Sequence, residues 1–153
     1  MRNSLLIIAV LVLLVSTVAH AQAPTYKTYA NARFAYSISY PFNLVPQGES
    51  ENGDGQKFRS SDGRAELIVY ASNNALDQTL KGLYDETRAP GKVMYEVLKP
   101  GWFVVSGVDN GKVFYQKTIL RQNVFKTFRI EYDESVKQHW DPITAKIARS
   151  FKG

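Results

Sequence analysis

A stretch rich in oxygen-bearing side chains, residues 47–56 (QGESENGDGQ), offers the clearest candidate for ligand chemistry in this chain. Ser50, Asn52 and Asp54 alternate and a glycine takes the sixth position, as in calcium loops whose alternating residues supply oxygen ligands. The first position holds Ser in place of Asp, and the twelfth holds Ser61 where a bidentate Glu is needed. The pattern permits a weak calcium site, and its Asn-Gly and Asp-Gly pairs equally predict a plain hairpin turn.

Candidate groups for acid–base and nucleophilic chemistry are few. His139 is the only histidine beyond residue 21, and the chain has no Gly-x-Ser-x-Gly motif, so no nucleophile with its own base is indicated. Acids that could pair are Glu49, Glu51, Asp54, Asp133 and Glu134. A carboxylate pair would serve an acid-dependent hydrolase, but acids in polar loops are ordinarily solvated. We therefore predict a non-catalytic protein and keep the hydrolase as an alternative.

Cysteine is absent, which excludes thiol catalysis, thiolate metal sites and disulfide stapling. The net charge of +5 is small, and the basic residues are spread along the chain. Basic and aromatic residues such as Tyr115 and Lys117 mix over residues 112–129, as on nucleic-acid-binding surfaces. Alternation assigns several of those aromatics to a core, so no nucleic-acid partner is expected. No cofactor is predicted, with calcium as the alternative.

Residues 1–21 have the features of a secretory signal peptide. Arg2 gives a positive start, residues 5–18 are apolar, and Ala19 and Ala21 place small residues where signal peptidase reads. The apolar run is shorter than the roughly twenty residues that a helix needs to cross a bilayer. We predict cleavage after Ala21, no stable membrane span afterwards, and a periplasmic or secreted protein. Residues 22–28 are expected to form a flexible lead-in to a single domain.

The elements that position these residues are organised around residues 112–132. Val124, Phe128, Ile130 and Tyr132 recur at period two on one side, which predicts a strand with one buried face. Gln122-Asn123 predicts the turn that folds this strand back on the one before it.

Further strands are predicted over residues 34–40, 57–60, 65–70, 93–97 and 102–105, with an apolar connector at 42–46. Residues 67–70 are apolar without alternation, which predicts a strand covered on both faces. Asp109-Asn110-Gly111 predicts a hairpin turn, because Asn-Gly tolerates the positive backbone angles of tight primed turns.

Two helices are predicted to cover the sheet. One is capped by Asn73 or Asn74 and runs to about Thr87. The other starts with Asp141 as cap and Pro142 in the first helical position. Its apolar stripe consists of Ile143, Ile147 and Phe151, with Trp140 just before. The predicted fold class is α+β, an antiparallel β-sheet flanked by helices.

The order of these pieces resembles a known family. A strand ending in Tyr40-Pro41, the polar turn, a helix, residues 107–115 (GVDNGKVFY), residues 128–132 (FRIEY) and residues 147–151 (IARSF) follow one another as in the PsbP-like superfamily. That superfamily contains extrinsic proteins of the photosynthetic oxygen-evolving complex, a Ran-binding import factor and many small exported bacterial proteins. The NGDG segment with the strand after it looks most like the uncharacterised bacterial members.

The resemblance covers most of residues 29–151 and implies a single PsbP-like domain over residues 29–153, folded as an α/β/α sandwich. It implies a binding or assembly module that recognises a protein or cell-envelope component, and it supplies no catalytic motif. We expect ligand contacts in the polar loops, at Asn52, Asp54, Asp109 and Asn110, because recognition on a rigid body usually lies in loops. A weak calcium-dependent module would use Ser50, Asn52 and Asp54 instead.

Overall fold

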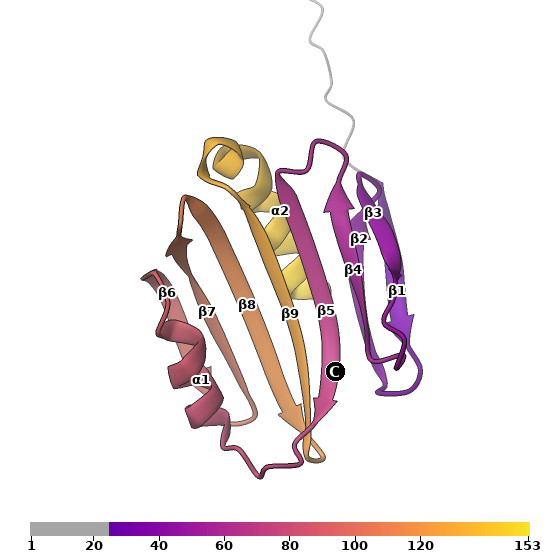
Figure 1. Ribbon diagram of the computed structural model, residues 1–153, viewed down its shortest axis with the longest axis vertical. Helices are drawn as coiled ribbons and strands as arrows, with labels where there is room; N and C mark the ends of the chain where they lie inside the picture. The colour runs from indigo at the N-terminus through magenta and orange to yellow at the C-terminus, as the bar shows by residue number, and fades with distance from the viewer. Residues whose placement is uncertain (1–24) are drawn as a thin grey trace, which may run out of the picture.

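The computed structural model describes residues 25–153, so the predicted signal peptide, its cleavage site at Ala21 and residues 22–24 lie outside the described residues. Within them, a seven-stranded antiparallel sheet in the order β3-β4-β5-β9-β8-β7-β6 lies beside a two-stranded sheet, β1-β2 (Figure 1). The strands are β1 (Tyr26–Asn31), β2 (Tyr36–Pro41), β3 (Leu44–Glu49), β4 (Gly55–Ser60), β5 (Ala65–Asn73), β6 (Lys92–Lys99), β7 (Trp102–Asp109), β8 (Lys112–Arg121) and β9 (Val124–Asp133). The helices are α1 (Leu80–Arg88) and α2 (Lys137–Ser150).

The predicted central hairpin is confirmed as β8 and β9. The two strands pair from Lys112 opposite Asp133 to Arg121 opposite Val124. Gln122 and Asn123 form the turn, with φ of 51° and 59°. Both angles are positive, as the primed two-residue turns require.

The two helices pack against opposite faces of the sheet. Phe128, Ile130 and Tyr132 of β9 belong to the main core, which also contains the buried side chains of α2 and the β1-β2 hairpin. Alternate residues of β7 and β8, among them Phe103 and Phe114, form a smaller core with α1. A mostly antiparallel sheet with two helices is therefore the observed architecture.

Helix α1 covers only part of its face of the sheet, and the burial of two strands therefore differs from what was expected. Thr127 is buried on that face because it meets Thr118 beneath α1, so β9 has more than one buried face. On β5, by contrast, Leu67 and Val69 are buried whereas Tyr70 is 38% exposed. The prediction that both faces of this strand are covered was wrong, because α1 lies over β6 and β7 and not over β5.

The N-terminal part of the described chain is more regular than predicted. Strand β1 begins at Tyr26, so residues 26–28 pair with β2 and are not a flexible lead-in. The expected apolar connector contributes to β3, where Pro46 is tolerated because β3 is an edge strand. As a result, the polar loop shrinks to residues 50–54 between β3 and β4.

Both helices begin elsewhere than predicted. Helix α1 is capped by Thr79, whose Oγ1 accepts from the Gly82 N–H at 3.0 Å; Asn74 instead accepts from the Gln78 N–H before the helix. Helix α2 follows a short 3₁₀ turn, Glu134–Val136, so Asp141 and Pro142 lie inside it. The predicted apolar stripe is confirmed, since Trp140, Ile143, Ile147 and Phe151 are all buried.

The β1-β2 hairpin joins the rest of the fold through side chains and one short bridge. Ser37 and Lys152 exchange two backbone hydrogen bonds of 2.9 and 3.0 Å, which link β2 to the segment after α2. Tyr36 and Phe151 pack edge to face across the same junction. No helix of residues 25–153 has the length and apolar character needed to cross a membrane.

Candidate functional site

The predicted polar loop is a closed hydrogen-bonded turn. The Asp54 carboxylate accepts from Ser50 Oγ at 2.5 Å and from Asn52 Nδ2 at 2.7 Å. Ser50 Oγ in turn accepts from the backbone N–H groups of Asp54 and Gly55, both at 3.0 Å. These side chains therefore fold the loop by bonding to one another.

The β1-β2 hairpin holds this loop from the side. Asn31 Nδ2 donates to the Gly53 carbonyl at 2.9 Å, and the Tyr36 hydroxyl donates to the Asp54 carbonyl at 2.8 Å. Arg33 Nη1 donates to the carbonyl of Asn52. The loop carbonyls, which calcium would also use, are thus engaged by donors.

The second predicted loop lies at the other end of the sheet. Asn110 and Gly111 form the β7-β8 turn with φ of 48° and 75°. Asp109 lies level with Lys112 of β8, whereas the strand register places Gly55 level with Thr118 of β8. Six residues of strand, about 20 Å, separate the two levels. Asn52 and Asp54 are therefore not brought together with Asp109 and Asn110.

A groove lies between α2 and the face of strands β6 to β8 that points away from α1. Its half near the β7-β8 turn has a volume of about 410 Å³, and the adjoining half near Trp102 has about 370 Å³. Tyr95, Tyr115 and Ala145 line both halves, so the two hollows are neighbours between α2 and the sheet.

Strand alternation and helix periodicity explain how the groove forms. Trp102, Val104 and Ser106 of β7 all point away from α1, as do Tyr115 and Lys117 of β8, so they form a floor of mixed aromatic and aliphatic character. On α2, one helical stripe faces this floor: Lys137, Asp141, Ala145, Ala148 and Arg149. The small side chains in the middle of this stripe leave the space open.

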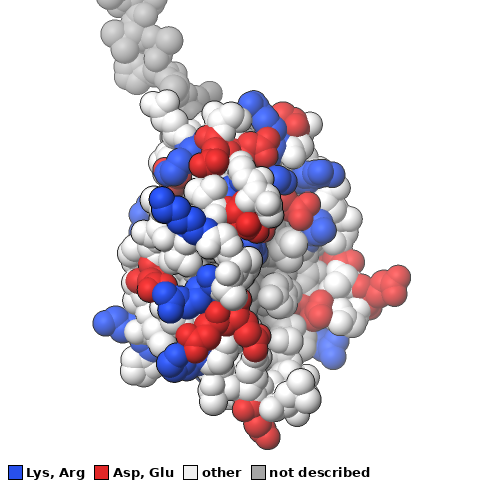
Figure 2. All heavy atoms as spheres, turned by 60° about the vertical axis from the view of Figure 1, so that its left-hand side comes forward, with Lys and Arg blue, Asp and Glu red and all other residues white. Residues whose placement is uncertain are grey.

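Apolar surface at the rim of the groove is exposed. On β6, Met94 is 65% exposed and Tyr95 is 55% exposed, whereas Val104 on the neighbouring strand is 3% exposed. Figure 2, which brings the β6 side of the molecule forward, shows acidic and basic side chains interspersed over this side and no large area of one sign. General adhesion to polyanions is therefore not favoured by this surface.

The Trp102 end of the groove is cationic. Lys117 Nζ lies 5.6 Å from the centroid of the Trp102 ring, within the range of a cation–π contact. Burial lowers the pKa of Lys117 below the ordinary lysine value. Neither Lys117 nor Arg149 forms a salt bridge with any residue that the structure describes.

The other end contains a polar network. The Tyr132 hydroxyl donates to Asp141 Oδ1 at 2.7 Å, and Lys137 forms an ion pair with Asp141 Oδ2. Burial, followed by this hydrogen bond to Asp141, raises the pKa of Tyr132. Thr144 is 4% exposed and also lines the groove, yet its Oγ1 has no hydrogen-bond partner among residues 25–153.

The groove also contains two carboxylates, Glu134 and Asp141, which bears on the hydrolase alternative. Both oxygens of Asp141 are already bonded, one to Tyr132 and one to Lys137. His139 is exposed on α2 and packs edge to face against Trp140, at a ring-centroid distance of 5.5 Å. The described residues contain no group of three His, Cys, Asp or Glu side chains placed to hold a metal ion.

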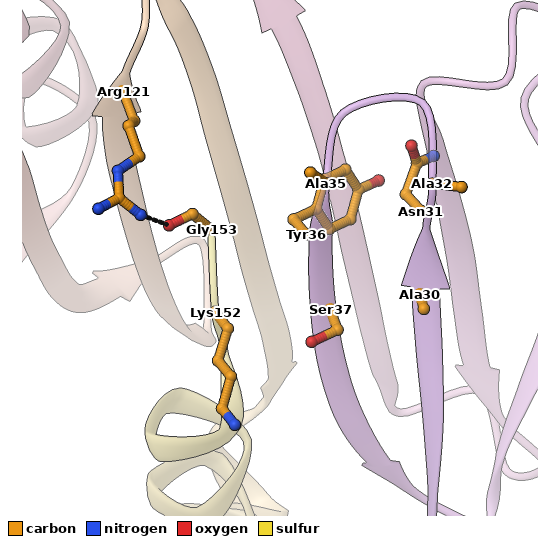
Figure 3. A pocket seen from close by; sticks show the side chains of 9 residues that line it. All are labelled: Ala30, Asn31, Ala32, Ala35, Tyr36, Ser37, Arg121, Lys152 and Gly153. Atoms are coloured by element: carbon orange, nitrogen blue, oxygen red, sulfur yellow. Dashed lines mark hydrogen bonds between the residues drawn. The ribbon is translucent and has the colours of Figure 1, made fainter.

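A second hollow, of about 470 Å³, lies between the β1-β2 turn and the segment after α2. Figure 3 shows that its walls are mainly small side chains and that its two cations diverge. Arg121 turns toward the Gly153 carbonyl, to which it donates at 3.1 Å, and Lys152 extends the other way. The two cations do not converge on one ligand position.

Sequence reasoning did not identify the groove. Tyr115 and Lys117 were noted as a mix of aromatic and basic residues, and their spacing of two places them on one face of a strand. Trp102, Tyr95 and Arg149 come from other elements, so only the fold brings them to the same place.

No protein-family model and no curated protein sequence matches this chain. Among solved structures, it is similar to the solution structure of cyanobacterial PsbP (CyanoP) from Synechocystis sp. PCC 6803. The two have a TM-score of 0.59 at 14% identity, over 90% of this chain and 98% of the other. The fold inferred from the order of strands, turns and helices is thereby confirmed: this chain has a PsbP-like fold.

Proposed function

We propose that this protein is an exported, non-catalytic binding or assembly module that holds a protein or cell-envelope component in the groove between α2 and strands β6 to β8. The observation that carries the proposal is the exposed apolar rim at Met94 and Tyr95 beside a largely apolar floor. Exposed apolar side chains bordering a concave surface are typical of sites that a partner covers.

The architecture supports this role. The proposed arrangement is a helix-flanked sandwich of the α/β/α kind. It gives the groove a rigid frame, because the groove floor consists of paired strands. The PsbP-like fold is consistent with binding or assembly. The fold does not identify the partner, so the chemistry of the partner has to be inferred from the residues of the groove.

Export rests on residues 1–21. Their charge and apolar pattern is that of a secretory signal peptide, which places the protein in the periplasm or outside the cell. N-terminal sequencing of the protein recovered from the periplasm or medium should start at Gln22. A start at Met1 would contradict cleavage after Ala21.

Site-specific photo-crosslinking tests the groove. A photoreactive phenylalanine analogue at Tyr95 should give a discrete adduct with one envelope partner in the producing cell. The same analogue at Tyr70, which is exposed on the opposite face, is the matched control. The crosslinked partner peptide should map to one segment, and Tyr115→Arg, which fills the groove floor, should abolish the adduct. Equal crosslinking from both positions would overturn the proposal.

Two alternatives keep their own tests. The acid-dependent hydrolase is favoured only by the presence of Glu134 and Asp141 in one groove. It requires hydrolysis of an envelope glycan by the purified protein that Glu134→Gln abolishes. Binding through Asn52, Asp54, Asp109 and Asn110 requires that alanine at these positions weakens capture of the partner found from Tyr95.

A further inference from the structure

We propose that the occupant of the groove is an acidic peptide segment in extended conformation, with a carboxylate seated between Lys117 and Arg149 next to Trp102. This inference rests on the proposed function, and it names the partner chemistry that the groove selects.

The cationic end lacks an acidic counterpart within residues 25–153. Lys117 is half-buried against Trp102, and neither Lys117 nor Arg149 has a salt-bridge partner in that range. Some cations of the described residues are paired, as Arg88 is with Glu96 and Arg129 with Glu131, and Lys117 differs from the exposed unpaired ones in being half-buried. A partly desolvated cation without a carboxylate favours a ligand that brings one.

The other end of the groove has complementary features. Glu134 is exposed there, and the buried Thr144 Oγ1 lacks a partner among the described residues. A ligand lying along the groove thus meets two cations at the Trp102 end, whereas at the Val108 end Lys137 is paired with Asp141 and Glu134 adds a carboxylate. This asymmetry fixes the direction in which a charged segment can bind.

The length and border of the groove fit an extended peptide. The floor from Trp102 to Val108 spans six residue steps, about 20 Å, which six or seven residues of extended chain can fill. The bordering strand, β6, is the outermost strand of the sheet. Both edge strands contain a register shift, between Val93 and Tyr95 in β6 and between Pro46 and Glu49 in β3, but β6 is longer and contains no proline. The largely apolar floor and the exposed Met94 and Tyr95 at the rim favour a peptide with apolar side chains over a polysaccharide.

The experiment uses the purified protein and three synthetic heptapeptides of alternating threonine and valine, blocked at both ends. The first ends in glutamate, the second has glutamine in that place and the third has lysine. Binding is followed by NMR through the Trp102 indole N–H and the Tyr95 amide. We expect the acidic probe to bind about tenfold more tightly than the glutamine probe, which corresponds to about 1.4 kcal/mol, and the lysine probe to bind least.

The variant Lys117→Gln/Arg149→Gln should remove the preference for the acidic probe and leave the glutamine probe within about twofold, since the apolar floor is intact. The matched control is Lys27→Gln/Arg59→Gln, which removes two exposed cations that form no salt bridge within the described residues. Unchanged circular dichroism and melting temperature show that both variants fold.

Four outcomes would overturn the inference, and they separate it from the proposed function. Equal binding of the acidic and glutamine probes leaves the groove as a binding site without the acidic preference. No shift at Trp102 or Tyr95 with any probe rejects an extended peptide, while the crosslinking at Tyr95 still decides the groove. Tighter binding of a heparin oligosaccharide with the same dependence on Lys117 and Arg149 identifies a polysaccharide. A dimer that Tyr95→Lys dissociates in sedimentation identifies a second copy.

Discussion

The ammonium group of Lys117 lies over the indole ring of Trp102, 5.6 Å from the ring centroid. The two residues come from neighbouring strands of one sheet, β8 and β7. This relationship places a positive charge at one end of a largely apolar groove, where water is partly excluded. It also makes the charge at this end of the groove depend on pH, because burial lowers the pKa of Lys117.

The affinity of the groove for an acidic ligand should fall as pH rises through the lowered pKa of Lys117. Below that pKa the side chain is charged and attracts the carboxylate, and above it the attraction is lost. The glutamate heptapeptide should bind more weakly at pH 10.4, about the ordinary pKa of lysine, than at neutral pH. Lys117→Gln should flatten this dependence. An affinity that is equally pH-dependent in Lys117→Gln would assign the effect to another group.

A buried pair of hydroxyls beneath α1 predicts a non-additive response to substitution. Thr118 Oγ1 and Thr127 Oγ1 lie 2.9 Å apart, with both residues buried. Thr118→Val should lower the free energy of unfolding by about 1–3 kcal/mol, because Thr127 keeps a buried polar group with no partner. The double variant Thr118→Val/Thr127→Val should recover part of this loss, as urea unfolding can measure. Additive losses would show that the hydroxyls are independent.

Lys126 predicts a pH-dependent contribution to stability. It is 5% exposed, and its Nζ donates to the Ala35 carbonyl at 3.2 Å. Burial, with a smaller effect of Arg121, lowers its pKa in the folded state. The unfolded chain therefore binds more protons between the two pKa values, so stability rises with pH in that window.

Lys126→Met should remove this rise. The free energy of unfolding of Lys126→Met minus that of the unmodified protein should be largest at neutral pH. This difference should fall as pH approaches about 10.4. Urea titrations across this range measure the difference, with Lys27→Met, at an exposed lysine, as control. A difference that is constant with pH would contradict the burial effect.

The loop between β3 and β4 is expected not to respond to calcium. Its Asp54 oxygens accept from Ser50 and Asn52, and the Gly53 and Asp54 carbonyls accept from the β1-β2 hairpin. Coordinating a cation would require breaking several of these bonds. We expect no rise in melting temperature on adding calcium and no fall on adding chelator. A calcium-dependent rise that Asp54→Ala abolishes would restore the calcium-dependent module.

Local chemistry made some elements predictable. The turn at Asn110-Gly111 was identified because its residues tolerate positive φ, and the turn at Gln122-Asn123 because it separates two strand-like runs; both join strands as expected. Alternation located the buried side of β9, and the stripe through Ile143 and Ile147 located the buried side of α2.

Other features depend on contacts distant in sequence. Tyr70 is exposed although its strand is apolar, because no helix covers that part of the sheet. Helix α2 starts before Pro142; the proline leaves the Gln138 carbonyl without an intrahelical donor, but Gln138 is exposed and water can solvate it. The groove draws on β6, β7, β8 and α2, so no single stretch of sequence shows it.

The bridge between Ser37 and Lys152 has a consequence for how the polypeptide reaches its native state. One of the first strands to be synthesised meets a segment made more than a hundred residues later, and α2 completes the core around β2. Contacts of such long range slow folding, because much of the chain must be ordered before they form. During translation, the nascent domain would stay open until its closing helix has left the ribosome, and that delay would suit the export that we propose.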